Sequence, residues 1–489
     1  MPLSVESMIT LNVLQNKWWA EQKRKEEAAN KLDLYHDDYE EIIREKMKEL
    51  FCKANINRLY YHVNQSQNIL KRVINEISTI YKVEPQRDYN EDKRYEEILG
   101  YLDLNTKLKK VNCYVNLLNE CLIKVGERKG KIVYDIITPN MCMVLQNEDD
   151  PTEADAIIYT TTSVNDVSKT DILYHYWDVE GSYRIFDGGF KLKKIVYDPE
   201  DPRATKGRSP YIDKKLKQYV MPFVVFRRQE PDSAFWDQDT GRDLYNATIM
   251  TGIKMTLLDY YFKVATFKQI YTVGDVVEIP NNQISDPLTI FRVSGENATV
   301  GLLDMQINMN QLKEAIEFQI NSVINNYGIS ADMWTLTPGE MSGRALKIKN
   351  ERLLEIRENQ LPFYRKAELE LFEITRIVNN AHFSQKISEN VEFSIDFGEL
   401  EWPEDPKEEL KLDIMKWGMG LYPTAQLYMK YNPDITDQKK AIKKWRQNIE
   451  DTLKFREENP SLDAELNKIL GQRGGFGGAV SPEGEEEEE

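Results

Sequence analysis

The stretch Ile329–Arg352, with the sequence ISADMWTLTPGEMSGRALKIKNER, interrupts two segments that have strong helical spacing. Gly328, just before it, predicts a helix end, because glycine often ends helices in a left-handed conformation. The sequence TPGE at 337–340 has the form of an N-cap threonine, a proline in the first helical position and a glutamate that closes a capping box, and Ser342 offers a second cap. We therefore expect a short loop, from residue 330 to about residue 336, between two helices.

The helix before this loop is predicted to run from about Met305 to Tyr327. Its apolar residues recur in steps of three or four and share one face, while the opposite face is polar and weakly acidic. At about 1.5 Å per residue such a helix is on the order of 33 Å long. An ordinary amphipathic helix that covers a core has the same pattern. The apolar stripe consists of Met305, Met309, Leu312, Ile316, Ile320, Val323 and Tyr327.

A second stripe with helical spacing comes earlier in the chain, at Leu244, Thr248, Thr251, Met255, Leu258, Phe262 and Ala265. Between the two helices, three β-rich runs are separated by turn residues: QIYTVGDVVEIP, LTIFRV and ATVGLL. After the loop, helical sequence continues for nearly 40 residues to His382, with a kink or break expected at Pro362.

The first half of the chain changes its periodicity once. Residues 5–83 and 91–124 have helical spacing, which in the second segment continues through Leu122. From Lys131 onward, short β-branched and aromatic runs cut by Gly, Pro, Asn and Asp predict a β-meander, and Pro222–Phe226 is one further strand. The fold class is therefore α+β and predominantly helical.

Bulk properties exclude several classes of protein. The 489 residues carry a net charge of -17, which argues against tight non-specific binding to DNA, because that requires basic patches. No run of 18 apolar residues predicts a membrane span, and the start of the chain lacks the pattern of a signal peptide. Cys52, Cys113, Cys121 and Cys142 show no paired spacing, so we expect reduced thiols in a cytosolic setting, most of them buried.

Motifs that carry catalysis are absent from the sequence. GERKGKIV at 126–133 lacks the spacing and the Ser or Thr of a phosphate-binding loop and predicts a turn between a helix and a strand. GGFGG at 474–478 predicts a flexible linker, and Asp149-Asp150 predicts a solvated turn. No HExxH, GxSxG or CxxC occurs. We expect no catalytic residue, cofactor or metal, with the scattered histidines in surface or core positions: His36, His62, His175 and His382.

The order of these elements resembles that of portal proteins of tailed bacteriophages, in the branch with an acidic C-terminal tail. The resemblance covers residues 220–470, whereas the first 130 residues share only a helical character. It includes GRALKIK at 343–349, VEFSIDF at 391–397 and GMGLYPTAQL at 418–427, and the chain closes with five glutamates. The resemblance implies a portal fold with wing, stem, clip and crown regions.

On that resemblance the chain divides into nine parts. These are a wing at 1–237 whose β-meander starts near 131, stem helix 1 at 238–266, a clip at 267–304, stem helix 2 at 305–328, a tunnel loop at 329–341, a long kinked wing helix at 342–382, a wing strand at 383–403 that returns to the first-half sheet, crown helices at 404–471 and a disordered acidic tail at 472–489.

The resemblance implies a non-enzymatic ring of twelve or thirteen subunits at one capsid vertex of a virion, assembled in the host cytoplasm without a membrane. Double-stranded DNA would pass through the ring during packaging and ejection. The implied partners are the terminase large subunit, head-completion or adaptor proteins, and the major capsid and scaffolding proteins. A net negative chain suits such a channel, because a basic lumen would retain the passing DNA.

The resemblance also assigns roles to residues. Met305, Met309, Leu312, Ile316, Ile320 and Val323 would pack or line the stem, and Val276, Glu278, Asn281, Asn282 and Arg292 would lie in the docking surface of the clip. The DNA-facing tunnel loop would contain Ser330, Ala331, Asp332, Met333, Trp334, Thr335, Leu336 and Thr337.

Two alternatives stay open at the level of sequence. Trp334 is either a bulky loop tip that touches DNA or a residue packed in a core, since large apolar side chains are usually buried. The whole chain is either a portal or a non-enzymatic helical scaffold or adaptor, with the acidic tail as an interaction arm. A closed ring would distinguish these two classes from each other.

Overall fold

The computed structural model describes most of the chain. The described residues are 16–51 except 17 and 19, 63–166, 169–198, 201–237, 241–266, 269–278, 292–303, 309–329, 351–399, and 406–458 except 422, 433 and 436. The chain divides into two compact units, one formed by Met1–Gly339 with Lys347–Glu401 and the other by Glu340–Leu346 with Trp402–Glu489.

Helices form the first part of the larger unit, as the spacing of its apolar residues predicts. In the most apolar of them, α5, Ile69, Leu70, Val73, Ile74 and Ile77 are all buried, and the side chain of Asn68 caps the helix by accepting from the backbone N–H of Lys71. The helices of this part are α2 (Gln22–Tyr35), α3 (Glu40–Leu50), α5 (Ile69–Ile77), α6 (Lys93–Leu102) and α7 (Leu104–Leu118).

Helix α7 ends earlier than its apolar spacing predicts. Asn119 takes a positive φ of 71° and directs the chain into strand β2 (Glu120–Arg128), so the prediction of a helix through Leu122 is wrong. Gly126–Val133 is not a turn between a helix and a strand either. It is the hairpin between β2 and β3 (Lys131–Ile137), where Lys129 and Gly130 both have positive φ, as a tight hairpin turn requires. Strand β11 (Phe223–Arg227) pairs with the other edge of β2.

The predicted meander is confirmed from Cys142 to Tyr197 as a five-stranded antiparallel sheet in sequential order, whereas its first predicted strand is β3 and belongs to the sheet of β2 and β11. Side chains on one face of this sheet, among them Tyr159 and Trp177, join the main core. Those on the other face, among them Ile158 and Tyr174, form a second cluster that Trp18 covers, with ring centroids of Trp18 and Tyr174 4.9 Å apart. The strands are β4 (Cys142–Gln146), β5 (Ala154–Asp166), β6 (Lys169–Asp178), β7 (Tyr183–Phe186) and β8 (Leu192–Tyr197).

Helix α11 (Glu351–His382) packs against β11 and β2 and has an unusually polar buried face. Gln360 donates to Asn116 at 2.9 Å, and Asn112 donates to the hydroxyl of Tyr364 at 2.8 Å. One turn further on, the helix presents Glu368 to the same core. These groups recur every four residues, so they lie on one side of the helix.

Glu368 forms a buried two-point ion pair with Arg87. The Nε and Nη2 atoms of Arg87 donate to the two carboxylate oxygens at 2.7 and 2.9 Å, and the side chains are only 7% and 1% exposed. Two-point contacts of this kind are among the stronger hydrogen bonds in proteins. The pair therefore joins α11 to strand β1 (Gln86–Asp88), across 281 positions of sequence.

Two expectations for this region need correction. Pro362 lies inside α11, on its exposed side, and the helix continues through it, so of the expected kink or break the break does not occur. The predicted wing strand is shorter than VEFSIDF, and in the first half of the chain it pairs only with β1, in a separate two-stranded sheet, and not with the meander sheet. This strand is β14 (Ser394–Asp396).

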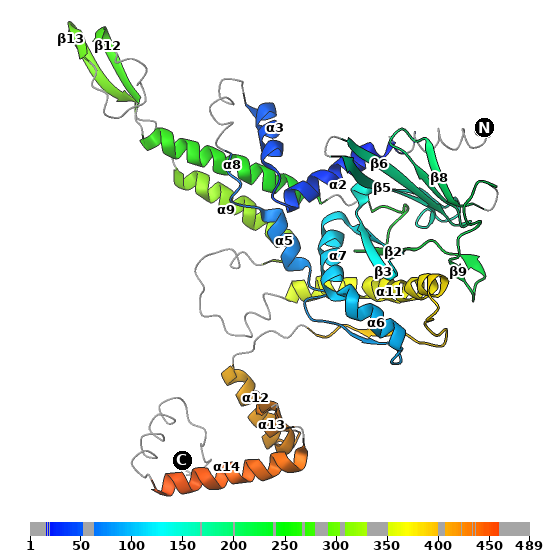
Figure 1. Cartoon of the computed structure of the whole chain (residues 1–489). Helices are drawn as coiled ribbons and strands as arrows, with labels where there is room; N and C mark the ends of the chain where they lie inside the picture. The colour runs from blue at the N-terminus through cyan, green and yellow to red at the C-terminus, as the bar shows by residue number, and fades with distance from the viewer. Residues whose placement is uncertain are drawn as a thin grey trace, which may run out of the picture. The chain divides into compact units, whose positions relative to one another are not determined.

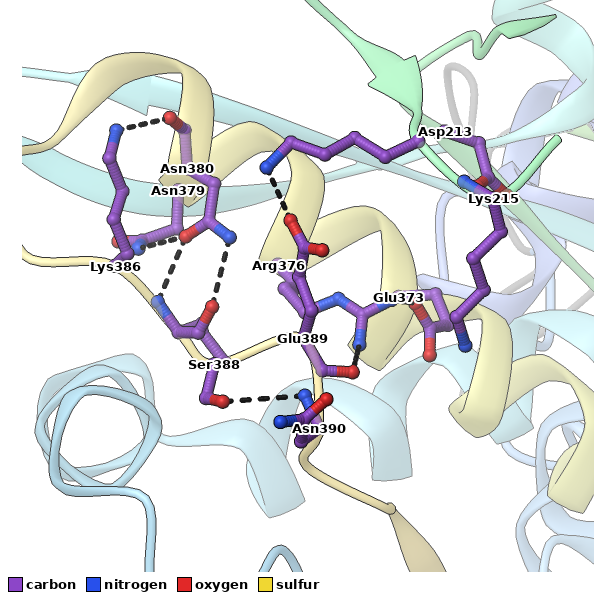
Figure 2. Close-up of polar contacts among 12 residues, drawn as sticks. Asp213, Lys215, Glu373, Arg376, Asn379, Asn380, Lys386, Ser388, Glu389 and Asn390 are labelled. Carbon is purple, nitrogen blue, oxygen red and sulfur yellow. Dashed lines mark hydrogen bonds and ion pairs between the residues drawn. The ribbon is translucent and has the colours of Figure 1, made fainter. Parts of the chain in front are cut away.

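Polar contacts also hold the chain as it leaves α11 (Figure 2). The side chain of Asn380 donates to the carbonyl of Ile387 and accepts from the backbone N–H of the same residue, both at 2.9 Å. Arg376 pairs with Glu373 and donates to the carbonyl of Glu389 at 3.3 Å, while the carboxylate of Glu389 binds Lys214. Lys214 follows strand β9 (Ile212–Asp213), which pairs with β10 (Gln218–Tyr219). The loop after α11 is thus joined to the β9–β10 hairpin.

The smaller unit consists of helices in its described part, as predicted for the crown segment. Helices α12 (Pro406–Gly418), α13 (Thr424–Tyr431) and α14 (Gln438–Glu458) follow one another. The segment 418–427 marks the change from α12 to α13, and Asp413 accepts from Lys430 at 2.7 Å and from the hydroxyl of Tyr431 at 3.0 Å. Many apolar side chains of α12 and α14 are exposed, among them Met415 at 64% and Leu453 at 56%. Residues 472–489, the predicted tail, lie outside the described residues.

Candidate functional site

Two helices of the larger unit, α8 (Arg242–Thr266) and α9 (Met309–Asn326), lie side by side and antiparallel (Figure 1). The hydroxyl of Tyr327, just after α9, donates to Asp243 at the start of α8 at 2.8 Å. Nearer the middle of both helices, Lys254 donates to Gln319. The β-rich insertion between them in sequence therefore connects the two ends of the pair that lie away from Tyr327.

The first half of α8 packs against preceding segments of the same unit. The side chains of Thr248 and Thr256 are buried and accept from the backbone N–H groups of Leu70 and Asn64, at 3.0 and 2.9 Å. Between these threonines, a Cβ added to Gly252 would lie 2.6 Å from the side-chain end of Ile43 in α3. The small residues at 248, 252 and 256 thus allow close packing, and their spacing of four is a sequence signal that could have indicated it.

The second half of α8 is less covered by its own chain. The predicted stripe holds for Leu244, Thr248 and Thr251, which are buried, but Phe262 is 64% exposed. The side chain of Ala265 is outside the described residues.

Helix α9 is partly covered as well. Of its predicted stripe, Ile316 is buried, while Leu312, Ile320 and Val323 are half-buried. Ile324, which the stripe omits, is fully buried. Phe318, on the face predicted to be polar, is 76% exposed. Met305 and the side chain of Met309 lie outside the described residues.

The charges on α8 and α9 balance. The two helices together contain four basic and four acidic residues, so the pair has no net charge. Such a surface provides no counterion-release affinity for a polyanion. The basic residues are Arg242, Lys254, Lys263 and Lys313, and the acidic residues are Asp243, Asp259, Glu314 and Glu317.

Gly328 ends α9 as predicted, with a φ of 71°, and the backbone N–H of Ile329 donates to the carbonyl of Ile324 at 3.2 Å. The start of α11 lies directly against this turn. A Cβ added at Gly328 would lie 2.9 Å from the Cβ of Arg352, and the guanidinium of Arg352 donates to the carbonyl of Asn325 at 3.3 Å. The two ends of the interval 330–350, at Ile329 and Glu351, therefore lie close together in the described structure.

The predicted tunnel-loop residues all fall within that interval. Ser330, Ala331, Asp332, Met333, Trp334, Thr335, Leu336 and Thr337 lie outside the described residues, as does the predicted capping sequence at 337–340.

The predicted clip is a two-stranded antiparallel ribbon in its described part. Strand β12 (Gln269–Glu278) pairs with β13 (Arg292–Leu303), in which the end of LTIFRV and all of ATVGLL form one continuous strand instead of two. The pairing brings Val276 opposite Val293 and Glu278 opposite Arg292, with a register shift between these two pairs. Asn281 and Asn282 lie outside the described residues.

A cavity elsewhere in the larger unit is lined by a perturbed titratable group that no motif indicates. Its volume is about 60 Å³, and Glu120 in its wall accepts from the backbone N–H of Asp237 at 2.6 Å. Burial raises the pKa of Glu120 to about 7, and burial lowers the pKa of nearby Lys25 to about 7. Arg24 lies 4.1 Å over the ring of Trp236. Ligand pockets usually measure about 300–1,000 Å³, so this cavity is too small for a substrate.

Apart from the exposed His36, the described cysteines and histidines sit in the fold as core or hydrogen-bonding groups. Cys121 and Cys142 are buried free thiols, and burial raises the pKa of Cys142 to about 12. Burial also lowers the pKa of His175 to about 4; its ring hydrogen-bonds to Thr161 and Tyr183, at 2.9 and 2.8 Å. Within the described residues, no group of three or more His, Cys, Asp or Glu side chains is arranged to hold a metal ion. No helix in this part of the chain combines the length and apolar character of a membrane span.

Comparisons with known proteins give distant structural neighbours. No family model matches the sequence, and no curated protein matches it. Among solved structures, a chain in the neck of an empty gene transfer agent particle, computed with C6 symmetry, is 8% identical with a TM-score of 0.41 over 72% of this chain and 86% of that one. A chain in the virion of a native gene transfer agent particle is 9% identical with a TM-score of 0.38 over 74% of this chain and 88% of that one. Scores at this level do not establish a shared fold.

Proposed function

We propose that this chain is a structural protein of a phage-like particle and, more specifically, the subunit of its portal ring. In this proposal α8 and α9 are the stem, the β12–β13 ribbon is the clip, and the segment between Gly328 and Arg352 contains the tunnel loop. The larger unit otherwise forms the wing, and α12–α14 belong to the crown.

The observation that carries the proposal is the junction at Gly328. A loop that contacts a moving polymer must be held at its base while its tip is free to move. The contact between Gly328 and Arg352 supplies such a base, because it joins the ends of α9 and α11. Two antiparallel helices, a ribbon between them and a loop with joined ends follow one another in the order that the sequence resemblance implies.

The exposed apolar residues of the stem support a ring. Phe262 and Phe318 are 64% and 76% exposed in the single chain, and side chains of this size are usually covered. In a head-to-tail ring each subunit covers a neighbour, and the interface closes when the rotation permits. We propose that neighbouring copies cover these residues.

The charge of the stem suits a channel for DNA. The four basic and four acidic residues of α8 and α9 cancel, and the whole chain is net negative at -17. A lumen of this kind would let phosphates pass without retaining them. In this proposal the chain itself performs no chemistry; the terminase motor docks on the clip and hydrolyses ATP, and head-completion proteins bind there later.

The mass and shape of the purified particle test the proposal. Twelve subunits of 57.2 kDa give about 690 kDa, and thirteen give about 740 kDa. Native mass spectrometry should find one of these masses at micromolar protein and moderate salt, and negative-stain microscopy should show a ring with a central hole. A monomer or dimer under these conditions would contradict the portal assignment and favour the scaffold or adaptor alternative.

A further inference from the structure

Helix α14 contains a dense group of cations in a chain that is otherwise acidic. Lys439, Lys440, Lys443, Lys444 and Arg446 lie within eight residues, and all five side chains are exposed. No acidic residue occurs between Lys439 and Arg446. We call these five residues the α14 cation face.

The packing of α14 leaves this face open within its own unit. Ala441 is buried, and Asn448 donates to the hydroxyl of Tyr428 in α13 at 2.9 Å, so this side of α14 faces α13. At 100° per residue, the five cations are centred on the other side of the helix. None of them forms an ion pair with another residue that the structure describes.

The distribution of charge along α14 points to an anionic occupant at one end only. The first half has five cations, whereas the second half contains Glu450, Asp451, Glu457 and Glu458 against two cations. An anionic segment would therefore be attracted to the first half and repelled from the second.

The chain itself contains a segment of matching charge. Glu483 and the run Glu485–Glu489 follow α14 in the sequence, with no basic residue after Arg473. The α14 cation face lies 12 to 19 residues before the end of the helix at Glu458, which is about 18–29 Å along its axis. The 26 residues from 459 to 484 can span up to about 85 Å when extended, so the glutamates can reach back to the face.

We propose that the glutamates of residues 485–489 bind the α14 cation face of the same chain. Five carboxylates would meet five cations, and each exposed pair is individually weak, so the contact depends on their number and on the tether that joins them. The occupied face would be unavailable to other polyanions. This contact does not depend on the portal assignment, because it requires only one copy of the chain.

Cross-linking of the full chain tests the contact directly. A carbodiimide joins a carboxylate to an amine only when they touch, so peptides linking residues 485–489 to Lys439, Lys440, Lys443 or Lys444 should form at about 50 mM salt. They should largely disappear near 1 M salt, where the screening length falls to about 3 Å. Lys191, Lys193 and Lys194, which are also exposed, provide the comparison. If the tail cross-links equally to both groups of lysines, the proposal is wrong.

A binding experiment distinguishes the tail from nucleic acid as the occupant. Fluorescence anisotropy with a short DNA duplex should show that deletion of residues 485–489 increases affinity about tenfold at low salt, since the face becomes available to phosphates. Lys439→Gln, Lys443→Gln and Lys444→Gln together should remove this increase in the deleted chain. The matched control, Lys191→Gln, Lys193→Gln and Lys194→Gln, should leave it.

Two results of the binding experiment would overturn the proposal. One is that deletion of residues 485–489 leaves the affinity for DNA unchanged, while the α14 substitutions lower that affinity equally with or without the tail. The α14 cation face would then be a nucleic-acid surface. The other is an increase that the α14 substitutions do not remove, because the tail would then act through the net charge of the whole chain.

Discussion

Helix α11 and the α8–α9 pair both consist of long amphipathic helices, but their own chain covers them differently. The inner face of α11 is buried, and its polar groups at Gln360, Tyr364 and Glu368 have partners in distant segments. On α8 and α9, by contrast, Phe262 and Phe318 remain largely exposed. The comparison shows that the subunit covers the inner face of α11 by itself, whereas we expect a neighbouring copy to cover the exposed apolar residues of α8 and α9.

The largest expected effect lies on the covered side of this comparison. Glu368→Ala leaves Arg87 as a buried charge without its carboxylate, which should lower the free energy of unfolding by about 3–5 kcal/mol. Urea unfolding of the dissociated subunit measures this loss. The double replacement Arg87→Met with Glu368→Leu should recover most of it, because no buried charge is left unpaired. A loss below about 1 kcal/mol for the single variant would mean that solvent reaches the pair.

The junction of the two regions should show an intermediate effect. Gly328→Ala places a side chain at a φ of 71° and within 2.9 Å of the Cβ of Arg352, so it should cost at least about 1–2 kcal/mol. Gly100→Ala is the matched control, because that glycine lies inside α6 with nothing within 4 Å of the added Cβ. It should stabilise the subunit by roughly 0.5–1 kcal/mol. Equal effects of the two substitutions on urea unfolding would contradict the Gly328–Arg352 contact.

A smaller effect on the stability of the subunit is expected at the exposed Phe262 of α8. Phe262→Gln should change the stability of the dissociated subunit by less than about 0.5 kcal/mol, yet reduce ring formation in sedimentation at fixed protein concentration. Ile253→Ala, in the buried first half of the same helix, should instead lower the free energy of unfolding of the subunit by about 2–5 kcal/mol. If Phe262→Gln leaves the sedimenting mass unchanged, neighbouring copies do not cover this position.

The smallest effect on both stability and assembly is expected at Trp334. In the tunnel-loop assignment Trp334→Ala leaves rings formed and the melting temperature nearly unchanged, while the length of packaged DNA falls. If Trp334 is packed in a core, the same substitution should cost about 3–5 kcal/mol. Thermal unfolding measured beside packaged DNA length therefore decides between the two roles.

Local sequence signals predict much of the fold. The helical spacing of α5, the alternating strands of the meander and the helix end at Gly328 all depend on neighbouring residues, and all are confirmed. The boundary between α7 and β2 was predicted wrongly because Leu122 happens to continue the spacing of three and four. Only the positive φ of Asn119 marks the change, and asparagine is tolerated in that conformation without requiring it.

Other features depend on residues far away in the chain and leave no local signal. Glu368 and Gln360 look like surface residues of a helix, yet their partners Arg87 and Asn116 are 281 and 244 positions away. The same holds for the candidate site. Its two helices could be predicted from spacing, whereas the contact between Gly328 and Arg352 needs the three-dimensional path of the chain.

The separation of Arg87 from Glu368 also bears on how the protein is made. At about 5–20 residues per second, a ribosome needs roughly 14–56 s to extend the chain by the 281 positions from Arg87 to Glu368. During that time Arg87 and strand β1 have neither the ion pair nor β14. Helix α7 likewise lacks its contacts with Gln360 and Tyr364. The segment from β1 to α7 of each new chain thus lacks these contacts until α11 has been made, and a slow or paused synthesis would lengthen its exposure to aggregation.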